Sequence, residues 1–186
     1  QRDGTIKSAF KDRGLEVKSF NASLLLEPWQ VETKQGGPYK VFTPFWKACL
    51  QQLDPPFPLP APREIPAPHA WPRSLRIEAL GLQPGIDWAA GIREAWAFGE
   101  ATAQARLEAF VDELLALYPE GRDQPGTDGT SRMSPYLHFG EIGPRQIWHA
   151  VQGAASEHDS KAVMRGAEKF LSELGWREFS RHLLFD

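Results

Sequence analysis

A hydroxyl-rich turn over residues 129–137 has the side chains needed to bind a phosphate. Three hydroxyls, from Thr130, Ser131 and Ser134, stand beside the guanidinium of Arg132, with Met133 between them. Such donors, together with backbone N–H groups and the positive end of a helix dipole, suit a phosphate or pyrophosphate. The same residues also fit an ordinary helix start, with Ser134 as the N-cap and Arg132 in solvent. From chemistry alone the helix cap is the more frequent case, because helix starts are commonly rich in Ser and Thr.

A second chemically promising group lies near the end of the sequence, over residues 173–182. At about 100° per residue, a helix here places Glu173, Trp176, Arg177 and Ser180 on one face. A carboxylate, an indole and a guanidinium beside a buried stripe can line a pocket for a flat, polar ligand. The alternative is a partly buried Trp176 with an intrahelical Glu173–Arg177 ion pair, worth only a few tenths of a kcal/mol. The residue pattern leaves both interpretations open.

Helices must position both groups, because apolar residues recur at helical spacing from residue 99 onward. Proline at the first helical position marks two of the predicted helix starts. The expected elements are a helix over 99–118, a polar loop over 120–130, and helices that begin at Ser134, at Pro144 and at about Ser160. Trp148 faces the apolar side of its helix, so we expect it in the core.

The first residues predict a different kind of structure. Ile6, Ala9 and Phe10 have helical spacing, Gly14 ends the helix, and a strand is expected over 15–26. A lone helix and strand cannot bury both faces of the strand. We therefore interpret residues 1–27 as the last unit of an α/β domain, and we expect the chain to be an internal piece of a longer protein.

A proline-rich segment separates this unit from the helical half. Eight prolines between Asp54 and Pro72 exclude a regular helix or a central strand. A loop of this length is uncommon inside a compact domain, so the segment predicts a tether between two domains. Phe57 and the tryptophans Trp29, Trp71, Trp88 and Trp96 are the expected anchors.

Composition limits the class of protein. Apolar content of 41% and charged content of 24% are ordinary for a globular domain, and no apolar run is long enough for a bilayer. The lone Cys49 excludes a disulfide framework, and we expect a cytoplasmic protein. His138, His149 and His182 lack metal-ligand spacing, so no metal is predicted. A net charge of −3 argues mildly against nucleic acid, although local patches decide that question.

Four phrases of the sequence, in this order, resemble the photolyase/cryptochrome family, and within it the class I cyclobutane pyrimidine dimer photolyases. They are Tyr-Lys-Val-Phe-Thr-Pro-Phe-Trp at 39–46, Thr-Ser-Arg-Met-Ser-Pro-Tyr-Leu at 130–137, His-Phe-Gly-Glu-Ile-Gly-Pro-Arg-Gln at 138–146, and Glu-Leu-Gly-Trp-Arg-Glu-Phe at 173–179. The resemblance covers nearly the whole chain and is weakest in the proline-rich middle.

The resemblance assigns a role to each residue that matches a family motif. Tyr118 and the turn Thr130, Ser131, Arg132, Met133 and Ser134 would hold FAD, and Arg122 would pair with a DNA phosphate. Glu173 would hydrogen-bond the damaged bases and Trp176 would pack against the flipped dimer, which makes these two the expected catalytic residues. Photolyases are among the enzymes that flip the target nucleotide out of the duplex. Arg177 and Ser180 complete the expected DNA-binding set.

The resemblance also implies an architecture and an activity. The chain would be mainly α, with the end of an α/β antenna domain at 1–27, an interdomain linker at 28–98 and the first part of an all-α FAD-binding domain at 99–186. The full-length protein would be a carbon–carbon lyase acting on DNA with pyrimidine dimers, a monomer with FAD and a second antenna chromophore. This chain alone would be inactive. The alternatives are a cryptochrome-type blue-light photoreceptor and a non-enzymatic helical interaction module.

Overall fold

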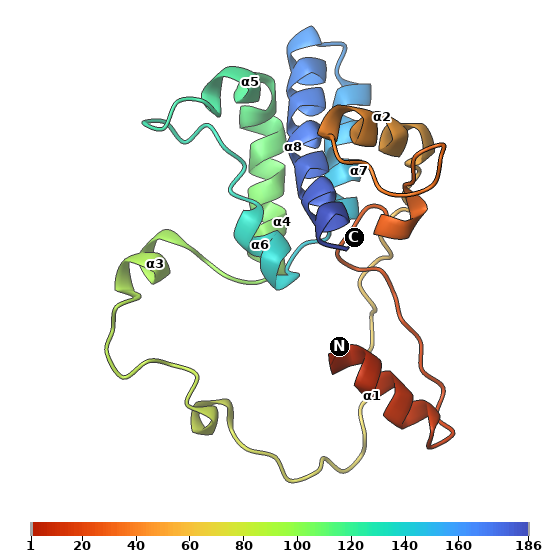
Figure 1. Ribbon diagram of the computed structural model, residues 1–186. Helices are drawn as coiled ribbons and strands as arrows, with labels where there is room; N and C mark the ends of the chain where they lie inside the picture. Colours follow the sequence, from red (N-terminus) through yellow and green to blue (C-terminus); the bar gives the residue numbers. More distant parts are fainter. Residues whose placement is uncertain (1, 186) are drawn as a thin grey trace. The chain divides into compact units, whose positions relative to one another are not determined.

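The computed structural model describes residues 2–185, and every regular element in that range is helical (Figure 1). The mainly α prediction is therefore confirmed. The chain divides into two compact units. One contains the residues up to Leu53 together with those from Gly175 onward, and the other contains 54–174. The long helix α8 (Lys161–Phe185) contributes residues to both units.

In the first unit, helix α2 (Phe42–Gln52) packs one apolar face into a small core. The buried members of that core are Val31, Phe45, Cys49 and Phe179. Trp46 lies flat against α8, because a Cβ on Gly175 would be 2.7 Å from its ring. Glycine is therefore required at position 175 for this close approach.

Buried polar groups of α8 hold the irregular chain that precedes α2. The carboxylate of Glu178 accepts hydrogen bonds from the backbone N–H groups of Leu25, at 2.8 Å, and Leu26, at 3.4 Å. His182 Nε2 accepts the N–H of Tyr39 at 3.0 Å. These bonds satisfy backbone donors that no helix or strand pairs, which a buried coil requires. The 3-10 helix η1 (Pro28–Gln30) lies within this coil.

The predicted strand over 15–26 is wrong. Helix α1 (Arg2–Lys11) forms, and Gly14 follows it with a left-handed φ of 73°, as expected. The following residues form no strand. A strand needs a neighbour to pair its N–H and C=O groups, and no other segment of residues 2–185 supplies one. Asn21 instead turns the chain, because its side-chain oxygen accepts the N–H groups of Ser23 and Leu24.

In the second unit, the predicted 99–118 helix forms as consecutive segments of different pitch. These are α4 (Glu100–Ala109), the π-helix η3 (Phe110–Leu114), the 3-10 helix η4 (Leu115–Leu117) and α5 (Tyr118–Gly121). Helix α7 (Pro144–Glu157) packs against α4 and η3. Its buried side includes Ile147 and Trp148, which confirms the prediction that Trp148 belongs to the core. Helix α6 (Ser134–Phe139) precedes it.

The segment from Pro56 to Ala95 is open chain with two short turns, η2 (Ile77–Leu80) and α3 (Ala90–Ala95) (Figure 1). Its prolines prevent longer elements, as predicted. Phe57 stacks on His149 with ring centroids 4.0 Å apart, so this anchor is confirmed. Trp71 and Trp88 are exposed, so these two expected anchors are wrong.

Candidate functional site

Arg106 fixes the backbone of the hydroxyl-rich turn. Its guanidinium donates to the carbonyl oxygens of Ser131, at 3.1 Å, and Thr130, at 3.2 Å, and forms an ion pair with Asp128 at 3.3 Å. Ser131 is buried, and its hydroxyl accepts the N–H of Met133 at 3.3 Å. One helical arginine therefore holds the carbonyl side of the turn.

Arg132 is the one non-glycine residue within 2–185 that has a left-handed backbone, with φ of 55°. This conformation is unfavourable for a residue with a Cβ and is often found at functional sites. Its guanidinium pairs with Asp128 at 3.0 Å and lies 5.9 Å above the ring of Trp96. Trp96 thus serves as an anchor, as expected, and its contact with Arg132 joins the linker to the turn.

The start of α6 differs from the prediction by one residue. Met133, not Ser134, is the N-cap, and no side chain caps the helix. Pro135 therefore occupies the second helical position. Because α6 has only six residues, its dipole adds little to anion binding. The turn can offer a phosphate its side chains and the backbone N–H groups at the start of α6.

A second cluster in the same unit joins three residues to which the sequence assigned separate roles. Arg122 forms an ion pair with Glu173, and Lys169 lies 3.7 Å from the same carboxylate. The Arg122 guanidinium also lies 5.7 Å above the ring of Tyr118. The hydrogen bond to Glu173 raises the pKa of Arg122, and burial raises the pKa of the Tyr118 hydroxyl.

The loop between the two clusters closes through a glycine pair. A Cβ on Gly129 would overlap the carbonyl oxygen of Gly121, so the two backbones touch. Gly121 ends α5, which begins with Tyr118, and Gly129 precedes Thr130. The contact therefore brings the end of α5 to the start of the turn.

Trp176 presents a half-exposed indole in the first unit, with 46% of the residue exposed. Its ring stacks on Phe42, with centroids 3.9 Å apart and planes within 10°. Phe179 packs edge-on at 5.9 Å. The hydroxyl of Ser180 donates to the carbonyl of Trp176 at 2.9 Å, a bond within the helix that leaves the indole unaffected.

The predicted intrahelical pair between Glu173 and Arg177 does not form. Glu173 pairs with Arg122 and Lys169, whereas Arg177 pairs with Glu178 at 3.0 Å. Glu178 is buried and accepts two backbone N–H groups, so it draws the neighbouring guanidinium away from the predicted face.

Comparison with known proteins identifies the relatives of this fold and site. Residues 1–63 match the family described as DNA photolyase. Over 184 residues the chain is 41% identical to the deoxyribodipyrimidine photo-lyase of Agrobacterium fabrum, covering 98% of this chain and 38% of that protein. The chain is therefore similar to a photolyase over nearly its whole length. It is also 33% identical to Cryptochrome-2 of Arabidopsis thaliana, covering all of this chain and 32% of that protein.

A solved structure supports the same relationship. The crystal structure of a bacterial class III photolyase from Agrobacterium tumefaciens superposes with a TM-score of 0.91 at 41% identity, covering 99% of this chain and 38% of that chain. The chain therefore spans about two fifths of the length of the two photolyases just named.

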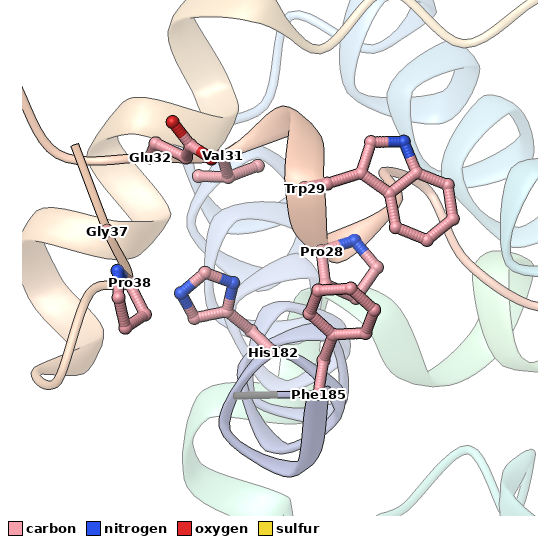
Figure 2. Close-up of a pocket in the computed structure, with 8 residues that line it drawn as sticks. All are labelled: Pro28, Trp29, Val31, Glu32, Gly37, Pro38, His182 and Phe185. Atoms are coloured by element: carbon pink, nitrogen blue, oxygen red, sulfur yellow. The ribbon is translucent and has the colours of Figure 1, made fainter.

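The first unit has a small pocket that none of the predicted site residues lines. Figure 2 shows its lining residues, which are Pro28, Trp29, Val31, Glu32, Gly37, Pro38, His182 and Phe185. Its volume of about 60 Å³ is far below the several hundred Å³ of ordinary ligand sites. It does not provide a flavin site.

Sequence reasoning missed the residues that hold the predicted ones in place. Arg106, Phe42 and Glu178 lie far along the chain from the residues they hold, and nothing in their local pattern distinguishes them from solvent-facing or core residues. Asp128 lies only four residues before Arg132, but it stands in a polar loop in which any carboxylate can face solvent. No group of three His, Cys, Asp or Glu side chains among the described residues is arranged to hold a metal. The described helices include none long and apolar enough to span a membrane.

Proposed function

We propose that the full-length protein containing this chain is a carbon–carbon lyase that uses light and FAD to split cyclobutane pyrimidine dimers in DNA. Its 41% identity to a deoxyribodipyrimidine photo-lyase over nearly the whole chain supports this proposal. The observation that carries it is the half-exposed, stacked indole of Trp176, on the same helix as Glu173 and three residues after it. An ordered, accessible indole is suited to stacking on an extruded base.

The turn has a donor set that fits the phosphates of FAD. Thr130, Ser131, Ser134 and Arg132 offer hydroxyls and a guanidinium, while Arg106 already occupies the carbonyl oxygens that would repel an anion. Tyr118 lies at the start of α5, whose end the glycine contact brings to this turn. When bound, FAD in its reduced and light-excited form would supply the electron for ring splitting and would regain it afterwards. A second antenna chromophore stays part of the proposal.

The roles of the DNA-facing residues follow from their charge and exposure. Trp176 stacks on the extruded pyrimidines, and Glu173 accepts hydrogen bonds from their N–H groups. Arg122 forms an ion pair with Glu173 and so holds its carboxylate in place. Arg122 also remains the proposed phosphate contact, with Arg177 and Ser180 farther along α8. Charged groups fixed beside a site where charge develops stabilise the transition state.

Two finer assignments concern the class of photolyase and the choice between a repair enzyme and a photoreceptor. The motif phrases predicted class I, whereas the identity to a class III photolyase favours class III. A cryptochrome-type photoreceptor is the second candidate, because Cryptochrome-2 is 33% identical over the whole chain. We favour the repair enzyme, since a photoreceptor has less need of an indole and a carboxylate for a dimer. We propose that the repair enzyme acts as a cytoplasmic monomer.

Replacing Trp176 by alanine tests the function. In the full-length protein, Trp176→Ala should weaken binding to dimer-containing DNA by about 1–3 kcal/mol, the usual value of base–aromatic stacking. Binding to undamaged duplex should not change, because paired bases do not leave the helix. A fluorescence titration with both duplexes measures the two affinities.

Trp29→Ala is the matched control. It removes another exposed indole of the same unit, and both affinities should stay at their wild-type values. Equal losses for both duplexes in Trp176→Ala would indicate a structural role for the indole. A wild-type protein that binds the two duplexes equally would exclude repair and favour the photoreceptor.

A further inference from the structure

Phe42 is the residue that holds Trp176 in place. The two rings are 3.9 Å apart and nearly parallel, so one flat face of the indole is covered by the phenyl ring. Phe179 packs against Trp176 edge-on at 5.9 Å and against Phe42 at 6.0 Å. The indole is thus supported from one face and one edge, while 46% of the residue stays exposed.

The support under Phe42 is itself well packed. Phe42 is the first residue of α2 and lies parallel to Trp46, with ring centroids 6.4 Å apart. Trp46 rests on the α8 backbone at Gly175, next to Trp176 in the sequence. A change at Phe42 therefore acts directly on the orientation of the indole.

A large exposed side chain normally samples several rotamers, and fixing one of them on binding costs conformational entropy. A ring held in place before binding avoids that cost. We propose that Phe42 is a positioning residue for dimer recognition, which fixes the plane of Trp176 so that its free face is ready to stack on an extruded pyrimidine. This inference rests on the proposed function.

The test replaces the flat ring while keeping most of its volume. In the full-length protein, Phe42→Leu should weaken binding to dimer-containing DNA about 3- to 10-fold, the range expected for losing one aromatic pair. Binding to undamaged duplex should stay the same. Phe42→Tyr keeps the ring and should retain wild-type discrimination between the two duplexes.

Phe45→Leu is the matched control. Phe45 lies one turn farther along α2, is buried, and contacts Phe179 at 5.1 Å. Its replacement disturbs the same core and should lower the melting temperature at least as much as Phe42→Leu, yet dimer discrimination should survive.

A spectroscopic measurement tests the stack without DNA. A phenyl ring on the indole face shields the indole protons, so the Trp176 signal of ¹⁵N-tryptophan-labelled protein, assigned with Trp176→Phe, should shift in Phe42→Leu. It should keep its position in Phe45→Leu. An unchanged signal together with unchanged discrimination in Phe42→Leu would overturn the inference.

Tighter binding of dimer-containing DNA by Phe42→Leu would also overturn it, because the phenyl ring would then occupy the face that the base needs. If the wild-type protein itself fails to discriminate, the proposed function fails and the inference falls with it. If the wild type discriminates and Phe42→Leu discriminates equally well, the inference fails and the proposed function stands, whether or not the Trp176 signal shifts.

Discussion

Glu178 shows how one buried side chain can give the fold a pH dependence. Burial raises the pKa of its carboxyl from 4.5 to about 7, against the opposing effects of the Leu25 N–H group and Arg177. The same burial, with the nearby Glu178, raises the pKa of the Cys49 thiol to about 12. The folded protein therefore holds the Glu178 proton more tightly than the unfolded chain does.

The sign of the effect on stability follows from this difference in proton affinity. Between the unfolded pKa of 4.5 and the folded pKa of about 7, unfolding releases a proton, so the free energy of unfolding falls as the pH rises. The stabilisation is complete below pH 4.5, and on the order of 3 kcal/mol is lost across the window. Glu178→Gln should flatten this part of the curve.

Thermal melting of wild type and Glu178→Gln at several pH values from 4 to 8 measures the difference. Glu32→Gln is the control, because its more exposed carboxyl should leave the slope unchanged. Parallel curves for wild type and Glu178→Gln would show that this carboxyl does not set the slope.

At the residue scale the sequence predicts donors better than it predicts their partners. The donor groups of the hydroxyl-rich turn follow from residue type alone, whereas helical spacing left open how much of Trp176 is exposed. The ion pair of Arg122 with Glu173 does not, because two charges distant in the chain meet only after the helices pack. The nearer partner Arg177 fits helical spacing, but a buried carboxylate next to it competes more strongly.

At the scale of elements, the packing of α8 on η4 depends on a single glycine. A Cβ on Gly166 would overlap the carbonyl oxygen of Leu115, so the two backbones are in contact. Gly166→Ala should lower the free energy of unfolding by about 1–3 kcal/mol, because the helices must separate to admit the methyl group. Urea denaturation followed by circular dichroism measures this change.

Gly153→Ala in α7 is the matched control, since nothing lies within 4 Å of its Cβ position. Alanine is the better helix former by about 1 kcal/mol, so this variant should be slightly more stable than wild type. Equal effects of the two substitutions would contradict the close contact at Gly166.

The predicted elements are confirmed where their signal lies within the segment itself. They are wrong where the element depends on contact with a distant segment. Proline marks the starts of α6 and α7 within one residue, and glycine follows the ends of α1 and α6 within three residues, because these residues have distinctive backbone preferences. The strand over 15–26 depends on a neighbouring strand, and the helix over 99–118 changes pitch in its second half. Neither property is encoded in the segment itself.

At the scale of the whole chain, the long exposed segment is the part most open to attack. Nearly every side chain from Pro56 to Ala95 is exposed, and few backbone hydrogen bonds hold the segment. Brief trypsin digestion of the 186-residue chain should therefore cut at Arg73 and Arg76 well before Arg106 or Arg177. Mass spectrometry of the first products measures the order.

The double variant Arg73→Gln, Arg76→Gln serves as the control and should lose those first products while it keeps the later ones. Early cutting at Arg106 would contradict the expectation that helix α4 protects this site from cleavage. Digestion thus tests the tether that the proline content predicts. The domain boundaries placed after residues 27 and 98 remain predictions.

The π-helix η3 has a consequence for how the chain can change over evolutionary time. A wide turn accommodates one residue more than an α-turn, and one residue corresponds to about 100° of rotation around a helix. Phe110 and Leu115, at its two ends, are both fully buried, so the extra residue keeps two apolar stripes in phase. A single-residue deletion within 110–114 that restored a regular α-turn would therefore leave Tyr118 at nearly the same angle to Phe170, because the wide turn had absorbed that residue. A single-residue deletion in the regular helix α4 would instead rotate everything after it by about 100°. The π-helix is thus the place in this helix where the loss of one residue disturbs the packing least.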